Sequence, residues 1–427
     1  MKLSTFGQKF AGESAIGELM EDLGESLAAR PAPLFMGGGN PGRIDAVQEV
    51  FAAQIMQRLD DPAQRHEMLG VYQPPDGDAA FRSALADTLN ERCGWGLSPQ
   101  NIAIANGSQS ACFILFNLFA GEVEGAEPRS IHLPITPEYV GYADLGLTQD
   151  FFSASAPVIE RMEQGEFKYR PDFDDLAELA GSNRIGAVCV SRPSNPSGNV
   201  VSDEELGQLS ALAASLDVPL IVDGAYGHPF PSLIYDTTEA TPFWDNNTIL
   251  MLSLSKLGLP GIRSGVIVAS EPVIQAFNRA NTVLNLACGN LGPSLLTPLL
   301  QDGTLRDLCQ QSLLPYYRER RDLALSLIRE QRGDLPIWVH RAEGAFFLWI
   351  WCEGLPIDSM LLYRRLKARG VLVLPGNGFF MGSGSHLPHA RECLRISYAG
   401  DTATIRQGIT VIMDELRRCY AEDSALP

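Results

Sequence analysis

Short apolar runs, each followed by polar residues, set the pattern of the first 300 residues. They occupy 102–105, 131–133, 187–190, 220–222, 248–252 and 266–269. Helical periodicity appears between them, for example over 110–119 and 203–216. Uniformly apolar runs of this length are typical of buried, mostly parallel strands, so the alternation predicts an α/β fold. Ligands of such sheets bind beyond the carboxyl ends of the strands, which is where the polar residues fall.

The pattern changes after about residue 300. Helices are predicted over 313–332, 359–369 and 403–419, and strands over 338–340, 345–351, 371–374 and 393–397. This second unit is α+β and smaller than the first. We therefore expect a large domain over 48–310 and a small domain that combines 1–47 with 311–427.

The segment before the first strand alternates helices with irregular turns. A short amphipathic helix is predicted around Ile16, and helices follow over 46–59 and 79–92. The apolar positions of the first helix are Ile16, Leu19, Met20, Leu23 and Leu27. The turn at 36–42 contains four glycines, which would let another group approach the backbone closely, although a simple bend explains them equally well. The loop at 71–77 carries one tyrosine, Tyr72.

The chain is acidic, with 33 Lys and Arg against 51 Asp and Glu. This charge argues against nucleic acid or an anionic membrane as a partner. None of the eight cysteines forms a C-x-x-C pair, and several lie within apolar runs, as expected for free thiols in a reducing compartment. The N-terminus lacks the apolar core of a secretory signal, and no apolar run reaches transmembrane length. We therefore expect a cytoplasmic protein.

One lysine stands out from the apolar stretch around it. Lys256, one of only five lysines, closely follows the run 248–252 and precedes Arg263 by seven positions. Burial would disfavour its ammonium form, lower its pKa and free the amine as a nucleophile and base. Such a lysine suits Schiff-base chemistry with a carbonyl compound. From this stretch alone, a lysine whose amine points to water is an equal alternative.

Other polar residues beyond strand ends could take part in chemistry, and each has an ordinary alternative. The segment 107–109 opens a helix after a strand and could bind an anion, or its serine could simply cap the helix. Asp223 ends an apolar strand, so its carboxylate needs a cation or a strong donor, which an arginine could also supply. The remaining candidates, each compatible with an ordinary packed or turn position, are Tyr139, Asn195 and Tyr226.

A loop near the C-terminus contains residue types that bind metals. His386 and His389 flank a Leu-Pro pair, and Cys393 follows. No second cluster accompanies them, and the proline and nearby glycines indicate a flexible loop. We therefore expect no metal.

Together these residues resemble the fold-type-I, class I and II aminotransferases, which use pyridoxal phosphate. The matches extend through most of the chain in the family's order; each alone is common, and their shared register is specific. They are Gly39-Asn40-Pro41, Tyr72 with Gly77, Gly107-Ser108-Gln109, Tyr139, Asn195-Pro196-Ser197-Gly198, Asp223-Gly224-Ala225-Tyr226, Ser253-Leu254-Ser255-Lys256 with Arg263, and Leu394-Arg395-Ile396. The resemblance implies a large domain with a mostly parallel seven-stranded sheet and a smaller α+β domain.

The resemblance also implies which residues contact the cofactor ring. Lys256 would hold pyridoxal phosphate through its amine and would later move the substrate's proton. Asp223 would keep the pyridine nitrogen protonated, so that the ring accepts electrons. Tyr226 and Asn195 would hydrogen-bond the phenolic oxygen of the ring. Tyr139 would stack on the ring face.

The same resemblance implies sites for the phosphate and for the substrate. Arg395 would bind the α-carboxylate of the substrate in a bidentate pair, helped by Asn195 and by the backbone of Gly39. Tyr72 would reach the phosphate of a neighbouring subunit's cofactor, which makes the protein a homodimer. The residues implied around the phosphate of the same subunit are Gly107, Ser108, Gln109, Ser253, Ser255 and Arg263.

The implied reaction is amino transfer between an amino acid and a 2-oxo acid in two halves, which predicts ping-pong kinetics. No further arginine occupies a family position that would mark a dicarboxylate substrate. Ile16, Leu19, Met20, Phe379 and Phe380 could form an apolar wall. We expect a small apolar substrate. The sequence of 191–200 is most similar to that of members acting on L-valine and pyruvate. Amino transfer between these two would give 3-methyl-2-oxobutanoate and L-alanine.

Two alternatives stay open at this point. One is a C–S lyase or other β-eliminating enzyme on the same scaffold. The other is a non-catalytic effector-binding domain, as in transcription regulators that carry an aminotransferase-like module. Those regulators append a basic helix-turn-helix, whereas this chain starts at the first helix expected of the enzyme. The partners that we expect are therefore an amino acid, a 2-oxo acid and a second subunit, without nucleic acid or membrane.

Overall fold

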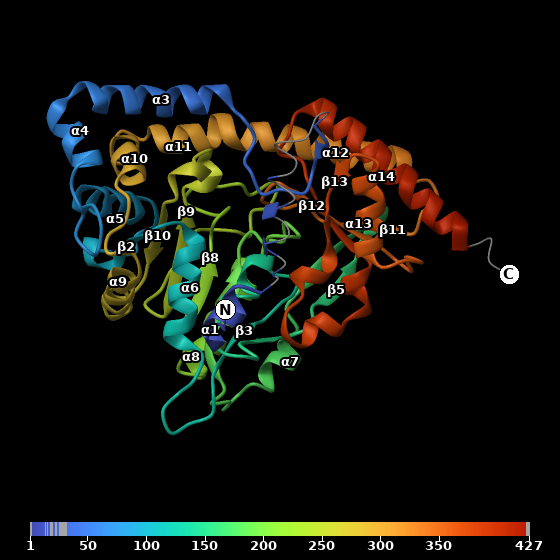
Figure 1. Cartoon of the computed structure of the whole chain (residues 1–427), viewed down its shortest axis with the longest axis horizontal. Helices are drawn as coiled ribbons and strands as arrows, with labels where there is room; N and C mark the ends of the chain where they lie inside the picture. The colour runs from blue at the N-terminus through green and yellow to red at the C-terminus, as the bar shows by residue number, and fades with distance from the viewer. Residues whose placement is uncertain are drawn as a thin grey trace.

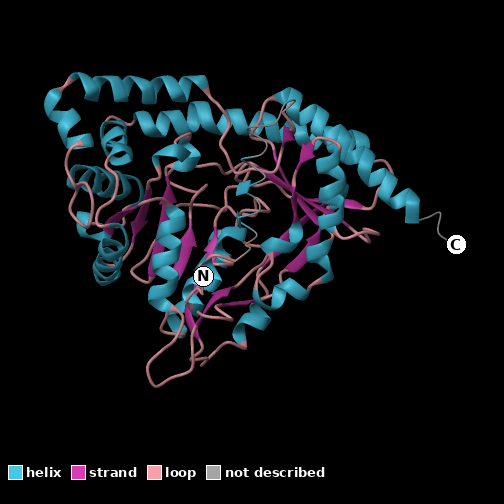
Figure 2. Cartoon of the chain, viewed as in Figure 1, coloured by secondary structure: helices cyan, strands magenta, loops and turns pink. Residues whose placement is uncertain are grey.

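Two large sheets and one two-stranded sheet, β1-β13 (Leu34–Phe35 with Val371–Leu372), flanked by helices, form the described chain (Figure 1, Figure 2). The structure is a computed structural model and describes residues 2–12, 14, 16–17, 20–21, 24 and 32–423. Within these residues, no helix is both long and apolar enough to cross a bilayer. All eight cysteines are free thiols, as predicted, and only Cys93 is not fully buried.

The first group of strands is a seven-stranded sheet in the order β2-β10-β9-β8-β7-β3-β4. β10 runs antiparallel to both of its neighbours, and the other adjacent pairs are parallel. The mostly parallel seven-stranded sheet is therefore confirmed. The strands are β2 (Ile102–Ala105), β3 (Ser130–Leu133), β4 (Phe152–Ala154), β7 (Ile185–Ser191), β8 (Leu220–Asp223), β9 (Thr248–Ser253) and β10 (Gly265–Val268).

Successive side chains of these strands enter two separate cores, because a pleated strand alternates its faces. On β8, Leu220 and Val222 belong to one core and Ile221 to the other. The face of Ile221 is covered by α6 (Ser108–Phe119) and α9 (Glu271–Asn285). The opposite face packs against α5 (Ala79–Cys93), α8 (Asp203–Ser215) and α10 (Leu291–Gln301). Burial on both faces explains why most of these strands are apolar almost throughout.

The second group of strands is a six-stranded sheet in the order β14-β15-β12-β11-β6-β5. The strands are β5 (Val158–Arg161), β6 (Glu166–Arg170), β11 (Ile337–His340), β12 (Phe347–Cys352), β14 (Leu374–Pro375) and β15 (Cys393–Ser397). β5 and β6 come from the range predicted for the large domain, yet they pair in this sheet. The division into domains at 48 and 310 remains a prediction.

Helices connect and cover the two sheets. α11 (Thr304–Leu308) continues through a π-helical turn, Cys309–Leu313, into α12 (Leu314–Arg332), which contacts α14 (Thr402–Asp423). Figure 1 shows this run crossing from the seven-stranded to the six-stranded sheet. α13 (Ser359–Ala368) packs against β14 and α14. α3 (Asp45–Asp60) matches the helix predicted over 46–59.

Some predicted elements were wrong or incomplete. The single strand over 371–374 is split: β13 (Val371–Leu372) pairs with β1 (Leu34–Phe35), whereas β14 pairs with β15. Val373 separates β13 from β14, and the glycine turn passes close to it. An added Cβ on Gly37 would lie 3.0 Å from the carbonyl oxygen of Val373. The helices that were not predicted are α1 (Thr5–Phe10), α4 (Pro62–Leu69), α7 (Phe173–Ala177), α9, α10 and α11, and the strands that were not predicted are β1, β4, β5 and β6. Leu19, Leu23 and Leu27 of the predicted N-terminal helix lie outside the described residues.

Candidate active site

The predicted candidates gather at one edge of the seven-stranded sheet. Asp223 is the last residue of β8 and Ser253 the last of β9. Gly107 follows β2 and caps α6. Because β10 runs antiparallel, Arg263, which precedes it, reaches the same edge. Segments far apart in sequence thus converge where ligands of α/β sheets bind.

Lys256 lies in a 3-10 turn, Ser255–Leu257 (η4), just beyond β9. Its Nζ donates to the carbonyl of Gly39 at 2.8 Å and lies 5.2 Å from the ring centre of Tyr226. Burial lowers the pKa of this amine to about 8; the charges of Arg395 and Arg263 also lower the pKa, whereas Asp223 raises it. This environment does not fit a lysine that points to water. It provides an amine that is partly neutral near neutral pH.

The lowered pKa predicts when Lys256 reacts with electrophiles. The neutral fraction of an amine rises as pH increases through its pKa. In ligand-free protein, acylation of Lys256 should therefore rise with pH and be half-maximal near pH 8. Ordinary exposed lysines, with a pKa of about 10.4, should reach that point only in more alkaline solution. Peptide mass spectrometry after brief labelling measures each lysine separately, and a midpoint for Lys256 near the ordinary value would refute the assignment.

Asp223 accepts a hydrogen bond from a strong donor, as expected for a carboxylate at the end of an apolar strand. The Tyr142 hydroxyl donates to Oδ2 at 2.5 Å, and the Ala225 N–H donates to Oδ1 at 3.0 Å. Burial raises the pKa of the carboxyl, while these two hydrogen bonds and the charge of Lys256 lower it. The donor is a tyrosine and not the arginine considered as the alternative. Sequence reasoning assigned no role to Tyr142, because only the order of the strands brings it to Asp223.

Arg395 is a fully buried cation on β15. Nη1 donates to Oδ1 of Asn195 and Nη2 to the carbonyl of Gly37, both at 2.5 Å, whereas Nε has no partner. The guanidinium lies 4.1 Å from the ring centre of Phe347 and 5.2 Å from that of Phe379. Burial lowers its pKa to about 10, and within the described part of the chain no carboxylate pairs with it. A buried charge without a counterion is costly, so this position suits a carboxylate ligand.

The glycine-rich turn contributes two carbonyls to the site. The carbonyl of Gly39 accepts the hydrogen bond from Lys256, and the predicted help of its backbone in binding the substrate carboxylate stays a prediction. The carbonyl that meets Arg395 belongs to Gly37. The turn therefore joins the lysine and the buried arginine, and it is more than a simple bend.

Gly107 and Arg263 form a second place suited to an anion. Gly107 has φ of +89°, and an added Cβ would lie 2.5 Å from Nη2 of Arg263. No side chain caps the N-terminus of α6, so Ser108 does not have the capping role considered above. The hydrogen bond recorded for Arg263 is a long one, 3.5 Å from Nη1 to the carbonyl of Pro260. A guanidinium beside the positive end of a helix dipole is suited to an anion bound between them.

Tyr139 and Tyr226 lie near these charges. The Tyr139 ring meets that of Tyr142 edge-on at 5.3 Å, and an added Cβ on Gly141 would lie 2.4 Å from the ring of Tyr139. Burial raises the pKa of Tyr139 to about 12, while the charges of Arg395 and Arg263 partly oppose that rise. Tyr226 is buried, and its ring meets that of Phe346 at 5.2 Å. The glycine at 141 thus makes room for the ring of Tyr139 itself.

The other predicted residues divide into two groups. Ser253 and Ser255 are buried beside Lys256, and the N–H of Ser255 donates to Oγ of Ser253 at 3.3 Å. Gln109 donates from Nε2 to the carbonyl of Gly141 at 2.8 Å and so fixes the loop after β3. Tyr72 is the exception, because its side chain is 81% exposed. This chain alone does not bring Tyr72 into the site.

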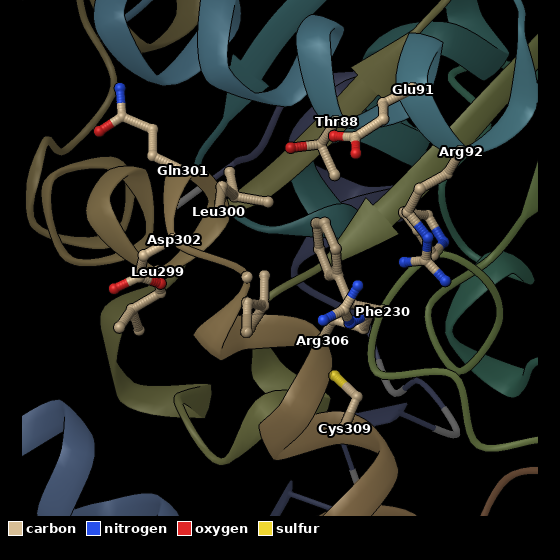
Figure 3. Close-up of a pocket in the computed structure, with 13 residues that line it drawn as sticks. Thr88, Glu91, Arg92, Phe230, Leu299, Leu300, Gln301, Asp302, Arg306 and Cys309 are labelled. Carbon is tan, nitrogen blue, oxygen red and sulfur yellow. The ribbon is translucent and has the colours of Figure 1, made fainter.

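A separate cavity of about 250 Å³ contains none of these residues. It lies between the end of α5, the loop after β8 and the segment that joins α10 to α11. Figure 3 shows Arg92, Phe230 and Arg306 among its lining residues. Its volume therefore does not mark the site that the chemistry indicates.

In the loop near the C-terminus, His389 contacts two other side chains. His389 Nε2 contacts the hydroxyl of Tyr169 at 2.5 Å and Sγ of Cys393 at 3.6 Å. Burial lowers the pKa of His389 to about 4. Within the described residues, no group of three or more His, Cys, Asp or Glu has an arrangement that could hold a metal ion.

Comparison with known proteins gives the family. Residues 42–412 match the aminotransferase class I and II family. Valine–pyruvate aminotransferase of Escherichia coli (strain K12) is 42% identical over 422 residues, which span 99% of this chain and 100% of that protein. The crystal structure of valine-pyruvate aminotransferase AvtA from Salmonella typhimurium LT2 superposes with a TM-score of 0.86 at 40% identity, over 96% of this chain and 100% of that chain. A solved protein from Psychrobacter arcticum 273-4 superposes with a TM-score of 0.95 at 44% identity, over 99% of both chains. The resemblance inferred from the motifs is thus confirmed, and the chain belongs to the class I and II aminotransferases.

Proposed function

We propose that this aminotransferase holds pyridoxal phosphate at Lys256 and exchanges an amino group between L-valine and pyruvate, giving 3-methyl-2-oxobutanoate and L-alanine. The observation that carries the proposal is a partly neutral amine, Lys256, close to two guanidinium groups, Arg263 and Arg395, for which the described chain supplies no carboxylate. Class I and II aminotransferases generally use this cofactor, and the E. coli relative is named for this substrate pair.

The residues at the sheet edge match the parts of that cofactor. The phosphate suits the N-terminus of α6 beside Arg263, where an added Cβ on Gly107 would already collide with the guanidinium. The serines and the glutamine that complete this set are Ser108, Gln109, Ser253 and Ser255. A flat ring suits the face of Tyr139, whose own ring lies against Gly141. A protonated ring nitrogen suits Asp223, whose carboxylate already accepts two hydrogen bonds.

Pyridoxal phosphate, when bound, supplies an aldehyde that condenses with amines and a ring that accepts the electron pair released at the substrate Cα. Lys256 provides the amine that holds the cofactor. Once the substrate amine has displaced it, the Lys256 amine would carry the proton between the substrate Cα and C4′ of the cofactor. The negative charge of Asp223, fixed beside the ring nitrogen, keeps that nitrogen protonated. Tyr226 and Asn195 orient the phenolic side of the ring.

The substrate carboxylate is assigned to Arg395. The side chain is held by Asn195 and Gly37 and has a free Nε, so its position is fixed before substrate arrives. The ring of Phe379 beside it is buried and supplies an apolar wall. Ile16 and Met20 remain candidates for the same wall, whereas Leu19 lies outside the described residues. An apolar pocket separates substrates that differ by one methylene by only about 10- to 200-fold, so activity with related small amino acids is expected.

We assign Tyr72 to the site of a second copy of this chain. Leu69, the last residue of α4, and Val71, on the loop that carries Tyr72, are also exposed, as are Val283 and Leu286 near the end of α9. The two segments approach each other, because Nδ2 of Asn290 donates to the carbonyl of Glu67 at 3.4 Å. Exposed apolar side chains on adjoining segments suit a homodimer interface.

The function is tested by absorbance and product analysis of the purified holoenzyme. L-valine should bleach the visible band of the bound cofactor, and pyruvate should restore it, with 3-methyl-2-oxobutanoate and L-alanine as products. A lyase would instead release pyruvate from cysteine without any acceptor acid. A non-catalytic effector-binding protein would turn nothing over. Either result would contradict the proposal.

Arg395→Gln should impair substrate binding more than cofactor binding. Removing the guanidinium leaves the substrate carboxylate buried without a partner, so kcat/KM for L-valine should fall by about 100- to 1,000-fold, chiefly through KM. Arg395→Lys should recover only part of this loss, because an ammonium lacks the planar fork. The matched control is Arg391→Gln, because the side chain of Arg391 lies just before β15 and is 70% exposed. An unchanged kcat/KM in Arg395→Gln would remove the residue from the substrate site.

Mixed dimers test the position of Tyr72. Tyr72→Ala and Lys256→Ala proteins should each be impaired, but a dimer containing one of each has one intact site and one site with both defects. Co-expressed proteins should therefore be more active than either parent. Sedimentation and native mass spectrometry establish that mixed dimers are present. Mixed dimers without any gain in activity would show that Tyr72 does not act across an interface.

A further inference from the structure

Four buried side chains form a line that leads away from the site behind Asp223. The Tyr142 hydroxyl lies 2.5 Å from Oδ2 of Asp223 and 3.3 Å from Oγ of Ser191. Ser191 Oγ lies 2.5 Å from Oε2 of Glu138, and its N–H donates to Oε1 of Glu138 at 2.8 Å. Glu138 and Tyr142 flank the turn after β3, and the other two residues end β7 and β8. Glu138 has no exposed surface, and none of the uses assigned above involves it.

The number of protons available decides how this line is connected. Three oxygen–oxygen contacts join the four side chains, and each needs one hydrogen. The hydroxyls of Tyr142 and Ser191 supply two. The nearby backbone N–H groups already donate to Oε1 of Glu138 and Oδ1 of Asp223. The third hydrogen must therefore lie on a carboxyl, at one end of the line or the other.

The surroundings of the two ends differ. Asp223 faces Lys256, whose positive charge lowers the pKa of Asp223. The titratable groups around Glu138 are Asp223, Tyr142 and Cys189, and no cation faces it among the described residues. Burial raises the pKa of Glu138 to about 8, with the charge of Asp223 acting in the same direction. Hydrogen bonds from Ser191 and from the Tyr139 N–H lower the pKa of Glu138, but burial outweighs them, so a proton is bound more favourably at this inner end.

We propose that Glu138 is a protonated carboxylic acid that donates to Ser191, which donates to Tyr142, which donates to Asp223, so that Asp223 is held as the ionised carboxylate. Glu138 is a positioning residue, since it touches neither substrate nor cofactor. Its effect on amino transfer rests on the proposed function, because the ionised Asp223 is what the ring nitrogen would require. The protonation of Glu138 itself does not depend on that function.

Two substitutions distinguish a protonated from an ionised Glu138. Glu138→Gln reproduces the protonated form, because the amide oxygen accepts from the Ser191 N–H and the amide nitrogen donates to Ser191 Oγ. Glu138→Leu has a similar size but removes both interactions. At metal sites, changing a residue that orients a ligand costs about 10- to 100-fold, and we take this as the scale for a positioning residue here. We expect Glu138→Leu to lower kcat/KM by that amount and Glu138→Gln to recover most of the loss.

The decisive readout is infrared spectroscopy of the protein, which does not require turnover. Wild-type protein should show a buried carboxylic-acid C=O band that is absent from Glu138→Gln and that disappears as pH rises through about 8. Ser191→Ala should shift this band, because Glu138 loses its acceptor. Absence of the band in the wild type, or equal losses in the two Glu138 variants, would overturn the proposal. Failure of L-valine turnover with the band present would instead refute the proposed function alone. If Glu138→Leu does not fold, the band and Glu138→Gln still decide the question.

Discussion

Lys256→Ala is expected to abolish amino transfer. The variant loses both the amine that holds the cofactor and the base that moves the substrate proton, and loss of a positioned acid–base group costs up to about 10⁴-fold in rate. We therefore expect kcat to fall by at least that factor. Binding at Arg263 and the N-terminus of α6 does not involve the amine, so some cofactor should remain bound. Stopped-flow absorbance with L-valine measures the loss directly.

The control for this variant is Lys367→Ala on the exposed side of α13. It removes the same side chain from a position distant in sequence from every predicted site residue, and its activity should match the wild type. Circular dichroism of both variants separates loss of chemistry from loss of fold. An active Lys256→Ala protein would contradict the mechanism entirely.

Asp223→Asn is expected to give the second-largest loss. The two side chains have nearly the same shape, but an amide cannot balance the charge of a protonated ring nitrogen. Removing one such fixed electrostatic partner costs about 10²- to 10³-fold in kcat. The spectrum of the bound cofactor should change with the activity, because the ring nitrogen loses its proton. Steady-state kinetics and absorbance on the same sample measure both effects.

Asp217→Asn provides a matched control at the opposite end of the same strand. Asp217 is exposed, precedes β8, and has φ of +56°, a conformation that asparagine adopts readily. Its substitution should leave kcat unchanged. Equal losses in the two variants would mean that Asp223 acts through the stability of β8 and not through charge.

The sequence predicted six of the seven strands of the first sheet because these six are buried on both faces, whereas β4, an edge strand that is only partly buried, was not predicted. Such strands are apolar throughout, so β2, β7, β8 and β9 were placed within two residues of their observed ends. The polar residue after each strand then identified Asp223, Ser253 and the start of α6. Local sequence is sufficient for this, because the carboxyl ends of parallel strands share one edge.

The contacts between distant segments could not be predicted in the same way. Tyr142 and Ser191 meet Asp223 only because β7 lies between β3 and β8, and the sequence does not state that order. Which carbonyl of the glycine turn meets Arg395 and which meets Lys256 depends on the exact path of the turn. α4 did carry a local signal: Asp61 caps it and Pro62 begins it, a pairing typical of helix starts.

Chemical trapping tests the central claim most directly. Borohydride reduction of the purified holoenzyme should convert the bond between cofactor and lysine into a stable amine, which proteolysis and mass spectrometry then locate. We expect one phosphopyridoxyl group on the peptide that contains Lys256, and none on Lys2, Lys9, Lys168 or Lys367. A label on one of those four lysines, or an unlabelled protein that still converts L-valine, would contradict the account.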